Sequence, residues 1–174
     1  MLETDRLILR QWQDADIEPF ARMNADPEVM RYFPCVLSFE ESKALFCKMQ
    51  NITSTNGWGW WALESKETGE FIGATGLVSV LFEAHFVPAV EVGWRIRREH
   101  WRKGFATEAA TAAKGYAKNK LRLPKLVSFT ACQTVPSIGV MKKIGMSQIQ
   151  PNFNHPNAPE GHPLQEHVVF EVKL

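Results

Sequence analysis

The sequence contains no apolar run close to the roughly 20 residues that a membrane-spanning helix requires. Its first residues, Met1 to Arg6, lack the basic and then apolar segments of a secretory signal. The three cysteines are odd in number and have no metal-like spacing, so they suit free thiols in a reducing compartment. These absences predict a cytoplasmic protein without a membrane partner.

Charge of one sign is also scarce, because 20 Lys and Arg residues face 19 Asp and Glu residues, for a formal net charge of +1. Such a balance provides no bulk attraction for nucleic acid, and we predict no nucleic-acid partner. The pattern Gly-x-x-x-x-Gly-Lys-(Ser/Thr) is absent, which argues against a nucleoside triphosphatase. The spacing of His155, His162 and His167 matches no frame of metal ligands, so no metal is predicted.

What remains is an ordinary globular composition: 174 residues with 45% hydrophobic side chains, enough for one domain spanning residues 1–174. Apolar periodicity and turn residues predict strands at 6–11, 58–64, 70–78, 88–96, 125–131, 146–150 and 166–172. They predict helices at 14–23, 27–33, 38–52 and 105–120, and a short helix that begins near residue 134. Residues 151–163, with four prolines, read as a long loop. This order predicts an α/β or α+β fold, with helices packed on a mixed sheet.

Residues 88–107 form the most informative stretch. Val90, Val92, Trp94 and Ile96 alternate with Glu91, Gly93 and Arg95, as in a strand with two different faces. A basic loop that includes Arg97, Arg102 and Lys103 leads to Gly104, and a helical pattern begins at Phe105. Free backbone N–H groups at a helix start, next to basic side chains, favour a bound anion such as phosphate.

The loop Trp101-Arg-Lys-Gly-Phe-Ala-Thr107 resembles motif A of the GNAT superfamily of acetyl-CoA-dependent N-acetyltransferases, which reads (Gln/Arg)-x-x-Gly-x-(Gly/Ala). Gly104-Phe105-Ala106 fits the second half, whereas Trp101 departs from the first position. The sequence pattern Trp-x-Lys-Gly-(Tyr/Phe)-Ala-Thr-Glu-Ala, which this chain matches, resembles that of the branch containing the ribosomal-protein N-terminal acetyltransferases, the RimJ/RimL-like enzymes.

The resemblance implies a mostly antiparallel, mixed sheet of seven strands with helices on both faces. Strands 88–96 and 125–131 would be parallel and splay apart, and acetyl-CoA would enter the gap. The implied cofactor-binding residues are Trp94 and Ile96 beside the pantetheine, and Arg97, Arg102, Lys103, Gly104, Phe105, Ala106 and Thr107 around the phosphates.

A second signature of the family reads roughly Asn-x-x-Ser-x-x-(Val/Leu)-(Met/Tyr)-x-Lys-(Leu/Ile)-Gly. Here Thr134 replaces its asparagine, and Met141 stands where many of these enzymes have a general-acid tyrosine. Ser137 resembles the serine that the ribosomal-protein branch places near the CoA sulfur. It is either a catalytic hydroxyl or a first-turn cap of its helix.

Glu91 is the candidate base, since a carboxylate among valines can take a proton from an ammonium acceptor, directly or through water. Alternatively it faces solvent or pairs with Arg95. Trp58, Trp60 and Trp61 either line the acceptor pocket or belong to the core. His162 or His167 would lie near the acceptor if the proline-rich loop does.

The leading hypothesis is an acyltransferase in which a primary amine, a protein N-terminus or a small amine, attacks acetyl-CoA in one ternary complex. The alternative is a non-catalytic module that senses CoA or acyl-CoA, and Met141 in place of tyrosine is its main support. The sequence leaves open whether the protein is a monomer or a homodimer.

Overall fold

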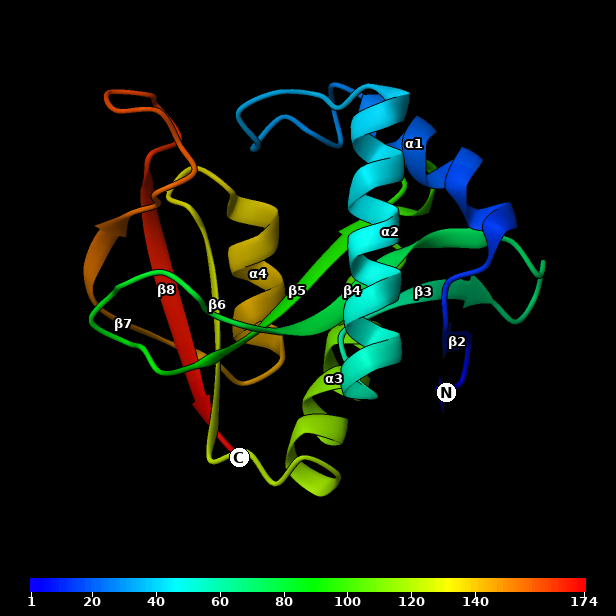
Figure 1. Ribbon diagram of the computed structural model, residues 1–174. Helices are drawn as coiled ribbons and strands as arrows, with labels where there is room; N and C mark the ends of the chain where they lie inside the picture. The colour runs from blue at the N-terminus through cyan, green and yellow to red at the C-terminus, as the bar shows by residue number, and fades with distance from the viewer.

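A computed structural model describes residues 1–174 and shows a single eight-stranded sheet covered by helices (Figure 1). The strands are β1 (Leu2–Glu3), β2 (Leu7–Arg10), β3 (Trp60–Ser65), β4 (Phe71–Ser79), β5 (Val90–Ile96), β6 (Lys125–Ala131), β7 (Ser147–Asn154) and β8 (Glu166–Lys173). The α-helices are α1 (Ile17–Ala25), α2 (Phe39–Asn56), α3 (Phe105–Asn119) and α4 (Val135–Lys143). No helix is both long and apolar enough to cross a membrane.

The strand order is β1-β2-β3-β4-β5-β6-β8-β7, and every neighbouring pair is antiparallel except β5 with β6. This confirms the predicted mixed, mostly antiparallel sheet with one parallel pair. The predicted count of seven strands was one too low. The additional strand, β1, pairs Leu2 with Leu9 and Glu3 with Ile8. Two residues are too few for any alternation to announce a strand.

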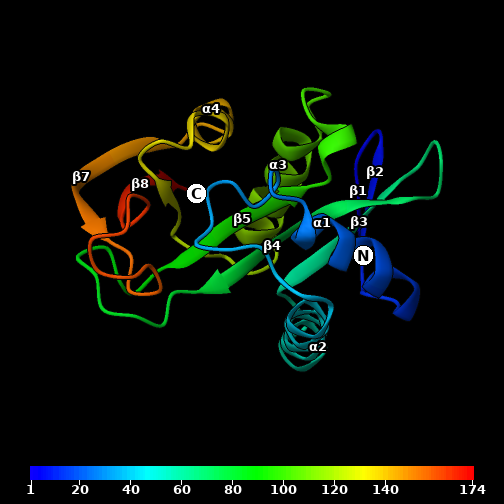
Figure 2. The same ribbon diagram turned by 90° about the horizontal axis from the view of Figure 1, so that it is seen from above.

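The helices form two layers, with α3 and α4 on one face of the sheet and α1 and α2 on the other (Figure 2). Under α3 the core contains four fully buried alanines, at positions 109, 110, 113 and 117. Because alanine is small, α3 packs close to the sheet, and this fixes where its N-terminus lies relative to β5. On the other face, Trp12 packs edge-on against Phe20 and Phe46 from α1 and α2.

Several predicted elements end a few residues away from their observed bounds, as α2 does by continuing to Asn56, and two predictions differ more. Residues 27–33 form turns rather than a helix. Val29 and Met30 of this segment are buried, so contacts with the core hold it, and a short helix gains too few hydrogen bonds to compete. The predicted loop at 151–163 begins later, because β7 continues to Asn154 past Pro151, with an irregular register between Ile149 and Phe153.

Candidate active site

The parallel strands β5 and β6 separate almost as soon as they meet. They pair at one position, Glu91 with Val127, whereas β5 pairs with β4 along all seven of its residues. Two hydrogen bonds show which backbone groups of this segment face β4. Thr75 Oγ1–H donates to Gly93 O at 2.8 Å, and Arg97 N–H, just after the strand, donates to Ile72 O at 2.9 Å. By alternation, the N–H and C=O groups of residues 92, 94 and 96 point into the gap.

This gap therefore has an open strand edge. Only one of its carbonyls is occupied by a side chain, since the indole N–H of Trp101 donates to Ile96 O at 2.8 Å. An extended molecule that carries amide groups can add to such an edge as another strand would. The predicted residues Trp94 and Ile96 lie on this edge.

A loop with six consecutive free amides follows. The N–H groups of residues 102–107 donate no intramolecular hydrogen bond, and the first bond of the helix runs from Glu108 N–H to Gly104 O at 3.1 Å. Arg102 and Gly104 have positive φ angles of 61° and 86°, which curl the loop. Successive free amides at the start of a 15-residue helix form an anion site, which the sequence predicted at this position.

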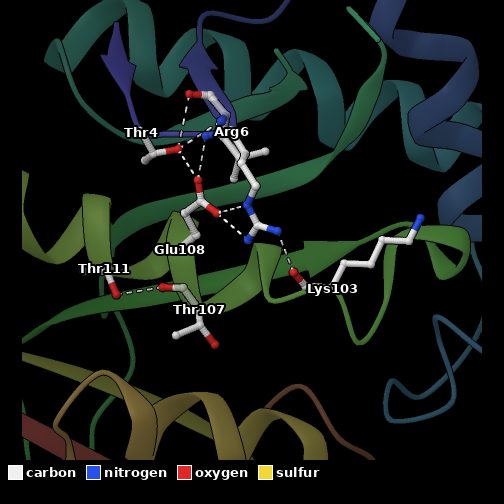
Figure 3. Close-up of polar contacts among 7 residues, drawn as sticks. Thr4, Arg6, Lys103, Thr107, Glu108 and Thr111 are labelled. Carbon is white, nitrogen blue, oxygen red and sulfur yellow. Dashed lines mark hydrogen bonds and ion pairs between the residues drawn. The ribbon is translucent and has the colours of Figure 1, made fainter. Parts of the chain in front are cut away.

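A network from the N-terminal strands supports this loop (Figure 3). The carboxylate of Glu108 accepts hydrogen bonds from Thr4 Oγ1 at 2.6 Å, Arg6 N at 3.0 Å and Arg6 Nε at 2.7 Å. The Arg6 guanidinium also donates to Lys103 O at 2.9 Å and lies 4.5 Å from the centre of the Phe105 ring. Although burial raises the pKa of Glu108, the hydrogen bonds from Thr4 and Arg6 outweigh it and keep this pKa below its ordinary value.

Sequence reasoning missed this network. Glu108 was visible only as an acidic residue in the first helical turn, and its partner Arg6 lies 102 residues away. By occupying Lys103 O, Arg6 fixes the carbonyl side of the loop and leaves its amides free.

The predicted basic residues fall into two groups. Arg102 and Lys103 are exposed and make no ion pair, and Figure 3 shows the Lys103 side chain extending away from the Arg6–Glu108 network. Arg97 instead donates to Phe71 O at 2.8 Å and pairs with Glu99. Its charge is thus already engaged beside β4, and its role as a phosphate ligand stays a prediction with less support.

The substitution Gly104→Val is expected to weaken acetyl-CoA binding by about 30-fold or more, the scale of one or two charge-assisted hydrogen bonds. Valine is strained at a φ of 86°, and its Cβ would meet Arg6 Nη2 at 3.4 Å, so the loop and its support would both shift. Calorimetry with acetyl-CoA measures the change. Gly69→Val is the matched control, because Gly69 also has a positive φ but lies in the β3–β4 turn with nothing near its Cβ. Equal affinity of the two folded variants would contradict the assignment.

The start of α4 provides the second set of candidates. Ser137 is half-buried, and its hydroxyl makes no hydrogen bond, so the structure does not show the capping role considered above. Thr134, at the N-cap, has a buried Oγ1 that is also without a hydrogen-bond partner. Met141 is buried in the core beside α3, with 1% exposure. A thioether in that position has no proton to donate, so the tyrosine of the general signature has no substitute there.

Glu91 lies at the point where β5 and β6 separate. It forms no ion pair, with Arg95 or any other residue, and burial raises its pKa to about 8. It is therefore neither a freely solvated carboxylate nor half of an ion pair. A carboxyl with a pKa close to the working pH is suited to general base catalysis.

The tryptophans have different roles. Trp61 is buried in the core at 3% exposure, edge-on to Tyr116, and Trp58 packs at the margin of the same core. The ring of Trp60 lies on the other face, over Gly93, where a Cβ would come within 2.9 Å of it. Trp60 thus shares a face with Glu91, and of the three it is the one placed to contact a substrate there.

Two of the predicted histidines belong to an aromatic group on that face. The rings of His155 and His167 lie 4.9 Å apart and pack against Phe129, which follows Val127 by two residues on β6. Burial lowers the pKa of both, that of His155 to about 4, so they are neutral near pH 7. His162 lies in the connecting loop, where its Nδ1 accepts from Leu164 N at 3.1 Å. No group of three His, Cys, Asp or Glu side chains is arranged around a metal position.

Two solved structures share the whole architecture. The GNAT-family acetyltransferase from Bacillus anthracis superposes with a TM-score of 0.81 at 23% identity, covering 99% of this chain and 97% of the other. The spermidine N-acetyltransferase from Vibrio cholerae, solved with CoA and spermine, gives a TM-score of 0.75 at 20% identity, with 98% and 96% covered. At these identities the likeness establishes the fold.

Sequence relatives establish more. The protein YkkB of Bacillus subtilis is 34% identical over 146 residues, covering 83% of this chain and 84% of the relative. The N-acetyltransferase YoaA of the same organism is 30% identical over 150 residues, covering 85% and 83%. Residues 6–147 match the acetyltransferase (GNAT) domain. Together with the free amides at the start of α3 and the splayed strands, this match shows that the chain belongs to the GNAT family of acetyltransferases, enzymes that transfer an acyl group from acetyl-CoA.

Proposed function

We propose that this acyltransferase transfers the acetyl group of acetyl-CoA to a primary amine, by direct attack within one ternary complex. The observation that carries the proposal is the continuity of two features: six free amides at residues 102–107 and, next to them, the open edge of β5. The amides bind the phosphates, and the pantetheine runs beside Trp94 and Ile96. The length of the pantetheine brings the thioester toward Glu91, where β5 and β6 separate.

Three groups then take part in the reaction. The amine nitrogen attacks the thioester carbon, and its proton passes to the Glu91 carboxylate, directly or through one water. A backbone N–H on the open edge of β5 stabilises the oxyanion that forms. The C–S bond breaks, and the CoA thiolate departs with a hydrogen bond from Ser137. Since a thiol has a pKa of about 8.5, the CoA sulfur can leave as a thiolate without being fully protonated. The reaction therefore needs no general acid at position 141.

The acceptor is a small amine or a protein N-terminus. Among structures of this fold, one is a spermidine N-acetyltransferase with spermine bound, and others are a ribosomal-protein-serine acetyltransferase and a RimJ solved with CoA-disulfide. These neighbours support an amine acceptor in both classes. The aromatic group around His155 and His167, on the same face as Glu91, supports an acceptor site lined by that part of the sheet.

Thiol release from acetyl-CoA, measured in the presence of a panel of small amines and N-terminal peptides, tests this function. Release that requires an amine, together with the acetylated amine detected by mass spectrometry, is the expected result. Tight binding of acetyl-CoA without release for any amine would instead favour the CoA-sensing module.

A further inference from the structure

Arg95 is a cation without a counter-ion on the face of β5 that carries Glu91. Its guanidinium carbon lies over the ring of Phe33, 4.3 Å from the ring centre. One nitrogen, Nη1, donates to Asn24 Oδ1 at 2.5 Å. Arg95 makes no other hydrogen bond and none of the six ion pairs of the structure.

Three arginines of the protein are half-buried, and of these Arg95 alone has no carboxylate partner, since Arg97 pairs with Glu99. Arg10, the third, donates to Asp16 at 2.7 and 2.9 Å and to Glu64 at 2.6 Å. Arg95 has five N–H donors and uses one of them, on a neutral amide. Burial lowers its pKa to about 10, so it still carries its charge at neutral pH. An enclosed charge that folding leaves unpaired is unfavourable unless a ligand completes it.

The surroundings of Arg95 place it beside the acceptor rather than beside CoA. Residues 91, 93 and 95 share one face of β5, whereas α3 and its anion loop pack on the face of Val92 and Ile96. Phe33 belongs to the connection between α1 and α2, which reaches over the sheet near β5 (Figure 2). Glu91 and Arg95 are four residues apart, which corresponds to roughly 13 Å along a strand, and both side chains are long enough to shorten the distance between their charged ends. The ring of Trp60 lies over Gly93, between these two residues.

We infer that Arg95 binds an anionic group, a carboxylate or another oxyanion, on the acceptor, so that the preferred substrates are amines that also carry such a group. The inference rests on the proposed function and names its substrate class. Because Arg95 uses one N–H donor on Asn24, its other N–H groups stay free for a bidentate contact. Asn24 fixes the guanidinium without neutralising it. A polyamine would place positive charge against Arg95 and is disfavoured.

Matched acceptors test the inference. We would compare an aromatic amino acid, its amide, the corresponding decarboxylated amine and the aminophosphonate of the same skeleton. The wild-type protein is expected to show kcat/KM about 10-fold or more higher for the acids than for the two analogues without an anionic group, and the phosphonate arm separates carboxylate from phosphate recognition. Equal or higher kcat/KM for the amines without an anionic group would overturn the inference while leaving the acetyl-transfer function intact.

Two variants locate the effect at Arg95. Arg95→Gln is expected to remove the preference by raising KM for the acids, with unchanged affinity for acetyl-CoA. Asn24→Asp supplies a carboxylate at 2.5 Å while retaining the guanidinium, so it is expected to remove the preference in a protein at least as stable. Arg31→Gln, an exposed arginine of the same connection, removes an equal charge and is expected to retain the preference. A preference that survives in Asn24→Asp, or a loss of acetyl-CoA affinity in Arg95→Gln, would contradict the assignment.

A binding measurement makes the test independent of turnover. Calorimetric titration of the CoA-saturated protein with each acceptor is expected to rank the acids above the amides. If thiol release failed for every amine while this ranking held, the acetyl-transfer proposal would fail and the anion site would stand. If thiol release occurred but the acids did not bind more tightly than the amides, the anion site would fail and the acetyl-transfer proposal would stand.

Discussion

Replacing Glu91 with glutamine is expected to lower kcat by roughly 100- to 10,000-fold, the contribution of a general base. Glutamine keeps the size of the side chain but cannot accept the proton of the attacking amine. Glu91 is not part of the anion loop, so the affinity for acetyl-CoA is expected to remain within about twofold, well below the tenfold that 1.4 kcal/mol would produce. Stopped-flow or steady-state thiol release, with calorimetry for acetyl-CoA, measures the two quantities.

The pH dependence identifies the group. Burial raises the pKa of Glu91 to about 8, so its basic form is in the minority at pH 7 and dominates above pH 8. With an acceptor amine whose own pKa lies below about 6, kcat/KM of the wild type is expected to rise through pH 8. The glutamine variant is expected to show no such rise. Choosing a weakly basic amine is essential, because an ordinary amine also loses its proton as the pH increases.

Stability provides an independent readout of the same group. A carboxyl that folding holds neutral binds its proton more tightly in the native state than in the unfolded state. The wild-type free energy of unfolding should therefore fall as the pH rises from about 4.5 toward 8, relative to the glutamine variant. Glu67→Gln, an exposed carboxylate in the β3–β4 turn, is the control for both experiments. Full activity with an unchanged pH profile in Glu91→Gln would exclude Glu91 as the base.

Ser137→Ala is expected to lower kcat by roughly 10- to 1000-fold, while acetyl-CoA binding changes much less. The physical reason is the loss of one hydrogen bond to the departing sulfur, which matters in the transition state more than in the bound substrate. Removal of a helix cap lowers the free energy of unfolding by about 1 kcal/mol. Because the Ser137 hydroxyl makes no hydrogen bond within the protein, we expect no such loss and an unchanged thermal midpoint.

The leaving group separates a catalytic from a structural role for Ser137. An acetyl donor with a more acidic thiol needs less stabilisation of its thiolate, so the defect of Ser137→Ala should shrink with it. Ser147→Ala, an exposed serine at the start of β7, is the control. A defect of equal size with both donors, or a lowered thermal midpoint, would assign Ser137 to the structure of α4 instead.

The sequence by itself determined what is encoded in neighbouring residues. Ser38 and Glu41 have the spacing of a capping box, and both reciprocal hydrogen bonds are present at the start of α2. Strand β6 was predicted with its observed bounds, and α3 with its first residue at Phe105. The free amides at residues 102–107 were predictable for the same reason. Strand, glycine and helix start adjoin one another, so a local pattern is sufficient to place an anion site.

Only the tertiary structure decided what depends on residues far apart in the chain. The support of the loop by Arg6 and Glu108 joins positions separated by 102 residues, and the pairing of Arg95 with Asn24 joins positions separated by 71. Alternation showed that Glu91 and Arg95 share a face, but it could not show that neither would find an ion-pair partner. The packing of other elements buries Glu91, which raises its pKa, and encloses the charge of Arg95 without supplying a carboxylate. The periodicity of one strand does not depend on those elements, so it could not predict either effect.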